Sequence, residues 1–273
     1  MNATQKAIKY LAIALAVLLI VSIVNGIVGI LRAFDYFFSS DTDTKDATVY
    51  TVSSAIHTVE MEIGGAEVRI EQGDSFSVVS NLKGLTVKEN RGVLTVKEKK
   101  LAAKISHGAF VTLYLPADTV LEHTDITTGA GSLTVEHLKT ETLRWVLGAG
   151  MAEADCLTVT RSAEIHGGAG KITVLDGSIH HLDLEMGIGQ LNLRAALPGE
   201  AELSLGIGES NITVIGEKDD YRLDIEKGLG EITLDGVSVG NVEKYGDGDD
   251  RIEIQGGIGS VNLSFEAADG HIK

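Results

Sequence analysis

The sequence predicts an all-β fold, a single-chain β-solenoid with about 19–20 residues per coil, behind one N-terminal transmembrane helix. Three observations carry this prediction. A Gly-x-Gly motif recurs seven times at nearly constant spacing, and apolar and polar residues alternate on both sides of each copy. The third observation is a long uncharged stretch within the first 40 residues.

The Gly-x-Gly motif opens seven similar segments, GAGSLTV, GAGMAEA, GAGKITV, GIGQLNL, GIGESNI, GLGEITL and GIGSVNL. Their first glycines are separated by 19, 20, 19, 19, 22 and 29 residues, and a weaker copy, GGAEVRI, starts at Gly64. A unit of this size cannot bury its apolar face alone, so a near-constant period predicts stacked coils. The predicted corner glycines are Gly129, Gly131, Gly148, Gly150, Gly168, Gly170, Gly187, Gly189, Gly206, Gly208, Gly228, Gly230, Gly257 and Gly259.

Alternating residues predict a strand on each side of every glycine pair. The position three before the first glycine is always apolar, from Ile126 to Ile254, and the positions four and six after it are mostly apolar. Equivalent side chains of stacked coils would form buried ladders at about 4.8 Å spacing. The glycines should supply positive φ and room at a corner. We expect the apolar residue between them, such as Ile207, to point inward.

The solenoid is expected to occupy residues 47–273, with irregular coils over 47–128 and regular Gly-x-Gly coils over 129–265. This length corresponds to ten or eleven coils, about 50 Å at the inter-strand spacing. The longest interval contains EKYGDGDD (243–250), which we interpret as a polar loop inserted at a turn.

The N-terminal segment has the length and composition of a membrane span. Residues 10–31 contain no charge over 22 positions, about what a bilayer core requires. Lys6 and Lys9 precede it, which predicts a cytoplasmic N-terminus over 1–9, a signal-anchor helix over 10–33 and an acidic juxtamembrane linker over 34–46. We therefore expect a single-pass protein of the cell membrane, with the C-terminal domain on the extracytoplasmic side. A cleaved signal peptide is the alternative.

Composition excludes several classes of function. The 273 residues carry a net charge of −16, which disfavours binding to nucleic acid or anionic lipid headgroups. Cys156 is the only cysteine, so no intrachain disulfide can form. The stretch HGGAGKITV is not a phosphate-binding loop, because Ile172 stands where the Mg²⁺-binding hydroxyl belongs and a strand follows instead of a helix.

Four residues before the first glycine, six of the seven coils carry an acidic residue. We interpret this acidic ridge as a solvated face, with binding of divalent cations or a basic partner as the alternative. Its members are Asp125, Glu164, Asp183, Glu202, Asp224 and Glu253. Asp247, Asp249 and Asp250 are weak metal candidates, since they lack the ligand spacing of an EF-hand. No catalytic set, cofactor motif or other metal site is legible, so the chain is not expected to be an enzyme.

The Gly-x-Gly-x-Φ-x-Φ units, their GIGQLNL and GIGSVNL versions, and VTLYLPADT ahead of the regular coils carry a family resemblance. Over roughly residues 47–265 the chain resembles the bacterial β-strand-repeat "putative adhesin" domains of unknown function. It is also similar to the GIN-domain "putative adhesin" heads. The resemblance implies a right-handed β-solenoid on the cell surface, often behind a single membrane helix, and it carries over no catalytic residues.

The leading functional hypothesis is therefore a non-enzymatic, membrane-anchored cell-surface protein for adhesion or envelope interaction. The alternative is an envelope scaffold or sensor-accessory protein that stacks through the solenoid ends, and a glycan-acting β-helix enzyme comes third. The expected partners are the bilayer, through residues 10–33, and a protein or glycan ligand at the surface. Self-association is a further expectation, and nucleic acid is not an expected partner.

Overall fold

The computed structural model of the protein describes residues 47–53, 55–99 and 108–267. The predicted transmembrane segment over 10–33 lies outside the described residues, as do its flanks over 1–9 and 34–46. Among the residues that are described, no helix is long and apolar enough to cross a membrane.

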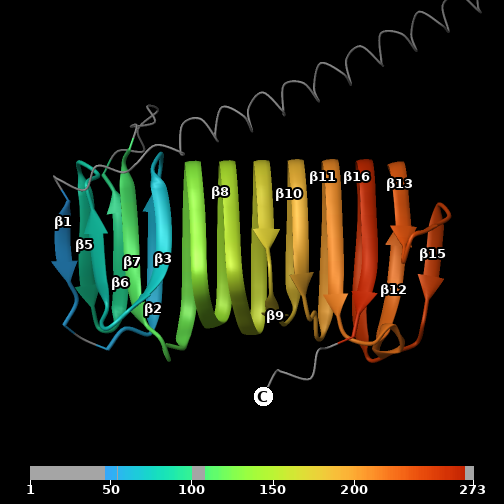
Figure 1. The fold of residues 1–273 in the computed structure, drawn as a ribbon, viewed down its shortest axis with the longest axis horizontal. Coiled ribbons are helices and arrows are strands. Elements are labelled where there is room, and N and C mark those ends of the chain that lie inside the picture. Colours follow the sequence, from blue (N-terminus) through green and yellow to red (C-terminus); the bar gives the residue numbers. More distant parts are fainter. Residues whose placement is uncertain (1–46, 54, 100–107, 268–273) are drawn as a thin grey trace, which may run out of the picture.

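The described chain is all-β and forms one open sheet of 16 strands, together with a single 3-10 turn at Lys218–Asp220. Figure 1 shows the strands side by side from β1 at one end of the stack to β15 at the other. The strands are β1 (Thr48–Thr51), β2 (Thr58–Ile63), β3 (Glu67–Gly73), β4 (Ser77–Ser80), β5 (Leu85–Asn90), β6 (Val93–Glu98), β7 (Phe110–Pro116), β8 (Leu121–Val174), β9 (Gly177–Ile179), β10 (Leu182–Ala195), β11 (Glu200–Ile215), β12 (Tyr221–Glu226), β13 (Leu229–Leu234), β14 (Val237–Ser238), β15 (Val242–Tyr245) and β16 (Asp250–Glu266).

The repeats stack in parallel and in register, as the period predicts. Leu184 of β10 pairs with Leu203 of β11, and Gly189 pairs with Gly208. β8 runs without interruption through three Gly-x-Gly motifs and continues the same register into β10. The stack is thus solenoid-like, and equivalent residues of successive coils form the ladders expected from the sequence.

The order of the coils in space departs from their order in the sequence at both ends of the stack. At the C-terminal end, β16 pairs with β11 on one side and with β12 and β13 on the other. At the opposite end, β2 and β3 lie between β8 and the later strands β6 and β7. Figure 1 shows β16 between β11 and β13. The last coil of the described chain is therefore an interior layer.

Both ends of the stack are covered by antiparallel strands. β4 pairs with β7 and β1 with β4, while β5 pairs with β6. At the other end, β15 pairs with β12 and β14 with β13. The stack contains nine coils, fewer than the ten or eleven expected. Seven are the Gly-x-Gly coils, and two more are formed by β2–β3 and β6–β7, while β1, β4 and β5 belong to the cap. The predicted polar loop over 243–250 also proves partly wrong, since β15 occupies its beginning.

The apolar ladders predicted from the sequence form the core. Ile126, Trp145, Ile165 and their equivalents before the glycines are fully buried, and so are those four and six residues after the first glycine. Each such aliphatic side chain contributes about 1.5–3 kcal/mol when removed from water. The core is one continuous column of these ladders.

The glycine pairs lie where coils pass closest to one another. A Cβ atom at Gly208 would overlap the carbonyl oxygen of Gly189, and one at Gly187 would overlap the oxygen of Gly168. At this corner the missing side chain would point along the stack, into the neighbouring backbone. Positive φ occurs at the second glycine of five pairs, Gly150, Gly170, Gly189, Gly208 and Gly259. At the first glycine of each pair, glycine is needed only because the backbone of the neighbouring coil lies so close.

The residue between the glycines is less buried than the predicted inward orientation requires. Ile207 and its equivalents are only partly buried, Ile258 is 41% exposed and Leu229 is 80% exposed. The chain bends at the motif, and Ile207 and Ile258 border the small space under the bend, at the edge of the core. The inward position is taken by the residue before the first glycine, such as the buried Met186 and Leu205.

Candidate interaction surface at the glycine corner

The corner carries a line of aliphatic side chains that we call the aliphatic ridge. It consists of Ile188, Ile207, Ile258 and Leu229, which are adjacent rungs of one parallel ladder. The same position in the earlier coils holds alanine, at 130, 149 and 169. Large aliphatic side chains therefore gather toward the β12 end of the stack, where their exposure is greatest.

A groove with a volume of about 580 Å³ runs beside this corner. Its floor contains the backbone of Gly168, Gly187 and Gly206, which have no side chains to fill it. Apolar groups come from Leu147, Met186 and Leu205, and polar groups come from His166, Glu185, Ser204 and Gln255. This volume lies within the range of ligand-binding clefts, which also combine apolar walls with a few polar groups.

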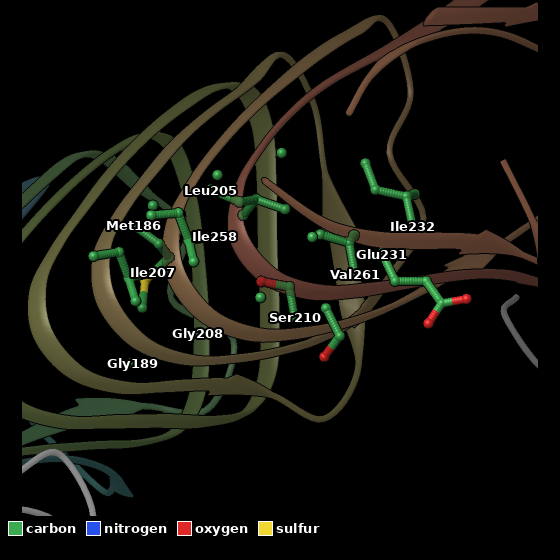
Figure 2. Close-up of a pocket in the computed structure, with 16 residues that line it drawn as sticks. Met186, Gly189, Leu205, Ile207, Gly208, Ser210, Glu231, Ile232, Ile258 and Val261 are labelled. Carbon is green, nitrogen blue, oxygen red and sulfur yellow. The ribbon is translucent and has the colours of Figure 1, made fainter. Parts of the chain in front are cut away.

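A second, smaller space lies under the corner. Figure 2 shows its lining, which includes Met186 and Leu205 before the glycines and Ser210, Ile232 and Val261 after them. Its volume of about 20 Å³ is close to that of one water molecule. This space is too small for an organic ligand, so of the two spaces at the corner the outer groove is the candidate binding site.

His166 is the one residue of the groove whose charge is set by a clear pair of partners. Its Nε2 lies 2.6 Å from Glu164 Oε1, and its Nδ1 lies 3.1 Å from Glu185 Oε2 of the next coil. The hydrogen bond with Glu164 raises the pKa of His166 above its ordinary value, and the bond with Glu185 raises it further. Partial burial of the imidazole lowers the pKa and offsets only part of this increase. Arg144 also approaches Glu164, at 3.8 Å.

We expect the His166 imidazolium to stabilise the fold at low pH. Because its pKa is raised on folding, this contribution is complete below the ordinary value of about 6.5 and is lost as the pH rises through the folded pKa. An NMR titration of the imidazole should give a pKa above 6.5, and Glu164→Gln should lower it more than Glu185→Gln. A wild-type pKa at or below 6.5 would contradict this assignment.

The structure brings the acidic ridge together in adjacent coils, in the order Glu164, Asp183, Glu202, Glu253 and Asp224. Cations neutralise its ends. Arg144 lies 3.3 Å from Asp125, and Arg251 lies 2.7 Å from Glu253 and 2.9 Å from Asp224.

Lys244 also lies 3.0 Å from Asp224, and it and Arg251 lower the pKa of that carboxyl. In the described chain no ion pair is made by Asp183 or Glu202, at the middle of the ridge.

No group of three or more potential metal ligands occurs within the described ranges. Asp250 instead accepts a hydrogen bond from the Gly199 backbone N–H at 2.7 Å, which fixes the start of β16 against the neighbouring coil. Asp247 and Asp249 are exposed in the preceding loop. The three weak metal candidates are thus not gathered into one site.

A family model matches residues 56–272, which is most of the chain. The chain belongs to the Toastrack DUF4097 family. None of the curated proteins compared with it matches.

Solved structures resemble this Toastrack chain at low identity. A "putative cell adhesion protein" from Clostridium sporogenes is 13% identical with a TM-score of 0.37, covering 81% of this chain and 99% of its own. A "putative adhesin" from Bacteroides fragilis is 11% identical with a TM-score of 0.40, covering 80% and 95%. Another from Parabacteroides merdae is 13% identical with a TM-score of 0.27, covering 81% and 94%.

The Toastrack coils also contain an asparagine ladder that sequence reasoning treated only as polar spacing. Asn211 Nδ2 donates to Asn192 Oδ1 at 3.1 Å, and Asn262 Nδ2 donates to Asn211 Oδ1 at 2.9 Å. Thr233 Oγ1 continues the chain of bonds to Asn262 Oδ1 at 3.0 Å. The signal for it was the repeated asparagine five residues after the first glycine. The asparagine side chains hydrogen-bond to one another across coils, which stabilises the register in which the coils stack.

The lysine of HGGAGKITV, Lys171, and the lone cysteine, Cys156, both belong to strands of the Toastrack stack. Lys171 pairs in register with Gln190, on the outer side of a strand that follows the Gly168–Gly170 corner. Cys156 is half-buried, and burial raises the pKa of its thiol, which lowers the fraction of reactive thiolate.

Proposed function

We propose that this chain is a non-enzymatic, membrane-anchored surface protein whose right-handed β-solenoid serves adhesion or envelope interaction. The observation that carries the proposal is the aliphatic ridge beside a groove of about 580 Å³, partly buried at Ile188 and Ile207 and exposed at Ile258 and Leu229. Exposed apolar groups in a continuous line are typical of surfaces that bind another macromolecule. A protein or glycan is the proposed ligand.

The anchor is proposed from the hydropathy of residues 10–33 and the preceding lysines. The described chain begins at β1, at the end of the stack farthest from β12 and β15 (Figure 1). An anchored stack would therefore carry the most exposed part of the aliphatic ridge away from its point of attachment. Protease added to intact cells tests this topology, since the domain over 47–273 should be digested from outside.

The binding role is tested with the full chain displayed on host cells that are then exposed to target cells and to arrays of proteins and glycans. Changing Ile188, Ile207 and Ile258 together to serine should lower retention about tenfold, the equivalent of roughly 1.4 kcal/mol. The matched control changes the alanines at 130, 149 and 169 to serine in the same ladder. Equal retention of both variants at unchanged thermal stability would overturn the role of the aliphatic ridge.

A second candidate function is a scaffold that associates through the end of its stack. The observation that favours it lies in the coil at the β15 end of the stack, β12–β13, where β14 and β15 leave the glycine corner uncovered. Leu229 at that corner is the most exposed large hydrophobic residue found in the described chain.

A further inference from the structure

The groove beside the glycine corner runs along the stack and crosses the strands. Its lining comes from five successive coils, from Leu147 at one end to Gln255 at the other. Glu185 pairs in register with His166 on one side and with Ser204 on the other. Ser204 pairs in turn with Gln255. Five coils at the inter-strand spacing of about 4.8 Å make a groove about 19 Å long, which favours a linear ligand over a compact one.

The floor and one side of the groove differ in polarity. The floor combines corner glycines with the buried apolar side chains of Leu147, Met186 and Leu205. The residue two positions before the first glycine is polar in four successive coils, and we call this column the polar rim. It consists of His166, Glu185, Ser204 and Gln255. A ligand that fits this groove must therefore have apolar faces and polar edges.

The polar rim offers hydrogen-bonding groups that the protein itself does not use. His166 uses both ring nitrogens for carboxylates, one of them Glu185 Oε2 at 3.1 Å. The Gln255 amide nitrogen donates to a carboxylate of its own strand at 3.2 Å. Within the described ranges, the Ser204 hydroxyl and the Gln255 amide oxygen have no hydrogen-bond partner. Oxygen acceptors beside a hydroxyl are suited to a ligand with several hydroxyl groups.

A polypeptide fits this groove less well than a sugar chain. β10 and β11 are paired on both sides, so their backbone groups are not available to a chain that lies across them. An extended peptide would place N–H and C=O groups against glycine and aliphatic surface, and buried backbone groups without partners are costly. A sugar chain has C–H groups on its ring faces and hydroxyls at its ring edges. It can place the faces on the floor and the edges against the polar rim.

Charge restricts the ligand to uncharged sugars. The acidic ridge lies two residues before the polar rim, on the same outer side of each strand. Its central members Asp183 and Glu202 make no ion pair in the described chain, and Glu185 adds a carboxylate to the groove itself. An anionic polysaccharide would be repelled from this side of a protein whose net charge is −16.

We propose that the groove binds a neutral, extended glycan of β-1,4-linked hexopyranoses that lies along the stack with one ring per coil. A ring of such a chain is close in length to the coil spacing of about 4.8 Å, so each ring can present a hydroxyl edge to one residue of the polar rim. This inference rests on the adhesion function proposed above and names its ligand. Ile188, Ile207 and Ile258 of the aliphatic ridge do not line the groove, so the two can be tested separately.

The test measures binding of the full-length chain to neutral β-1,4-linked oligosaccharides of glucose, mannose and N-acetylglucosamine by calorimetry. At least one series should bind, with an affinity that rises from the disaccharide to about the pentasaccharide and then levels off, because the groove spans five coils. No binding in any series, or no gain beyond the disaccharide, would overturn the proposal. A β-1,4-linked mannuronate hexamer should bind about tenfold more weakly than the best neutral hexamer. Equal binding would overturn the selection of a neutral chain.

Substitutions in the polar rim then locate the site. Ser204→Ala combined with Gln255→Ala should weaken hexasaccharide binding about tenfold. The matched control is Gln190→Ala combined with Ser260→Ala, which changes the same residue types in β10 and β16 outside the groove. Equal affinity of both double variants at unchanged thermal stability would overturn the assignment of the site.

Retention on target cells separates this inference from the adhesion function. Retention without saccharide binding would refute the glycan and leave adhesion standing, whereas loss of both would count against adhesion itself. Retention that requires Ser204 and Gln255 while no saccharide binds would overturn the proposal in favour of a peptide ligand.

Discussion

Gly208→Ala is expected to lower the free energy of unfolding by about 4 kcal/mol. Its φ of 148° is a conformation that costs a non-glycine residue about 2 kcal/mol. The new Cβ would also overlap Gly189 O, and forcing an atom into a packed position costs about another 2 kcal/mol. The neighbouring backbone cannot yield locally, because it is hydrogen-bonded into the ladder on both sides. Chemical denaturation followed by circular dichroism measures the change.

Gly236→Ala is the control for the backbone conformation alone. Gly236 also has positive φ, at 79°, but no atom lies within 4 Å of where its Cβ would be. This substitution in the exposed turn between β13 and β14 should cost about 1 kcal/mol. Similar losses for Gly208→Ala and Gly236→Ala would contradict the stacking argument, because they would leave no cost for the close approach of coils.

Trp145→Ala is expected to cost about 4 kcal/mol, within the usual range for removing a buried tryptophan. Trp145 is fully buried in the ladder between Ile126 and Ile165, in the middle of the stack. Neighbouring coils cannot collapse into the space, because the ladder hydrogen bonds hold them at fixed spacing. The cavity therefore remains, and its cost adds to that of the lost burial.

Trp145→Phe separates packing from polarity. The indole Nε1 is buried and has no hydrogen-bond partner in the described chain, so its removal breaks no bond and relieves an unsatisfied donor. Phenylalanine keeps one of the two rings and leaves a smaller cavity than alanine, so we expect a loss of about 2 kcal/mol, roughly half that of Trp145→Ala. Equal losses for phenylalanine and alanine would show that the indole makes a polar contact essential to the fold.

The sequence allows the ladders to be predicted because burial leaves a periodic record. Trp145, Leu184 and Leu203 recur at the same distance before a glycine, and each is buried as predicted. The orientation of Ile207 could not be read in this way. Alternation assigns sides only along a regular strand, and the bend at the glycine pair interrupts it. A partly exposed aliphatic residue at the bend then looks like a core residue in the sequence.

The order of the coils could not be predicted for a related reason. All Gly-x-Gly coils offer nearly the same ladder to their neighbours, so a local pattern cannot specify which coil lies on which. The 22- and 29-residue intervals were the only departures, and they accompany the insertion of β16 between β11 and β12. Arg251 specifies this position, since it pairs with Glu200 on one side at 2.7 Å and with Asp224 on the other at 2.9 Å.

The insertion of β16 decides which residues form the β12–β13 end of the stack, and hence which rung of the aliphatic ridge is the most exposed. Amide hydrogen exchange of the full chain tests it most directly. The amides of Ile252 and Ile254 in β16 should exchange as slowly as that of Leu203 in β11, and more slowly than those of the β14–β15 cap. Exchange of β16 as rapid as that of the cap would contradict the account, because it would place the last strand at the edge of the stack.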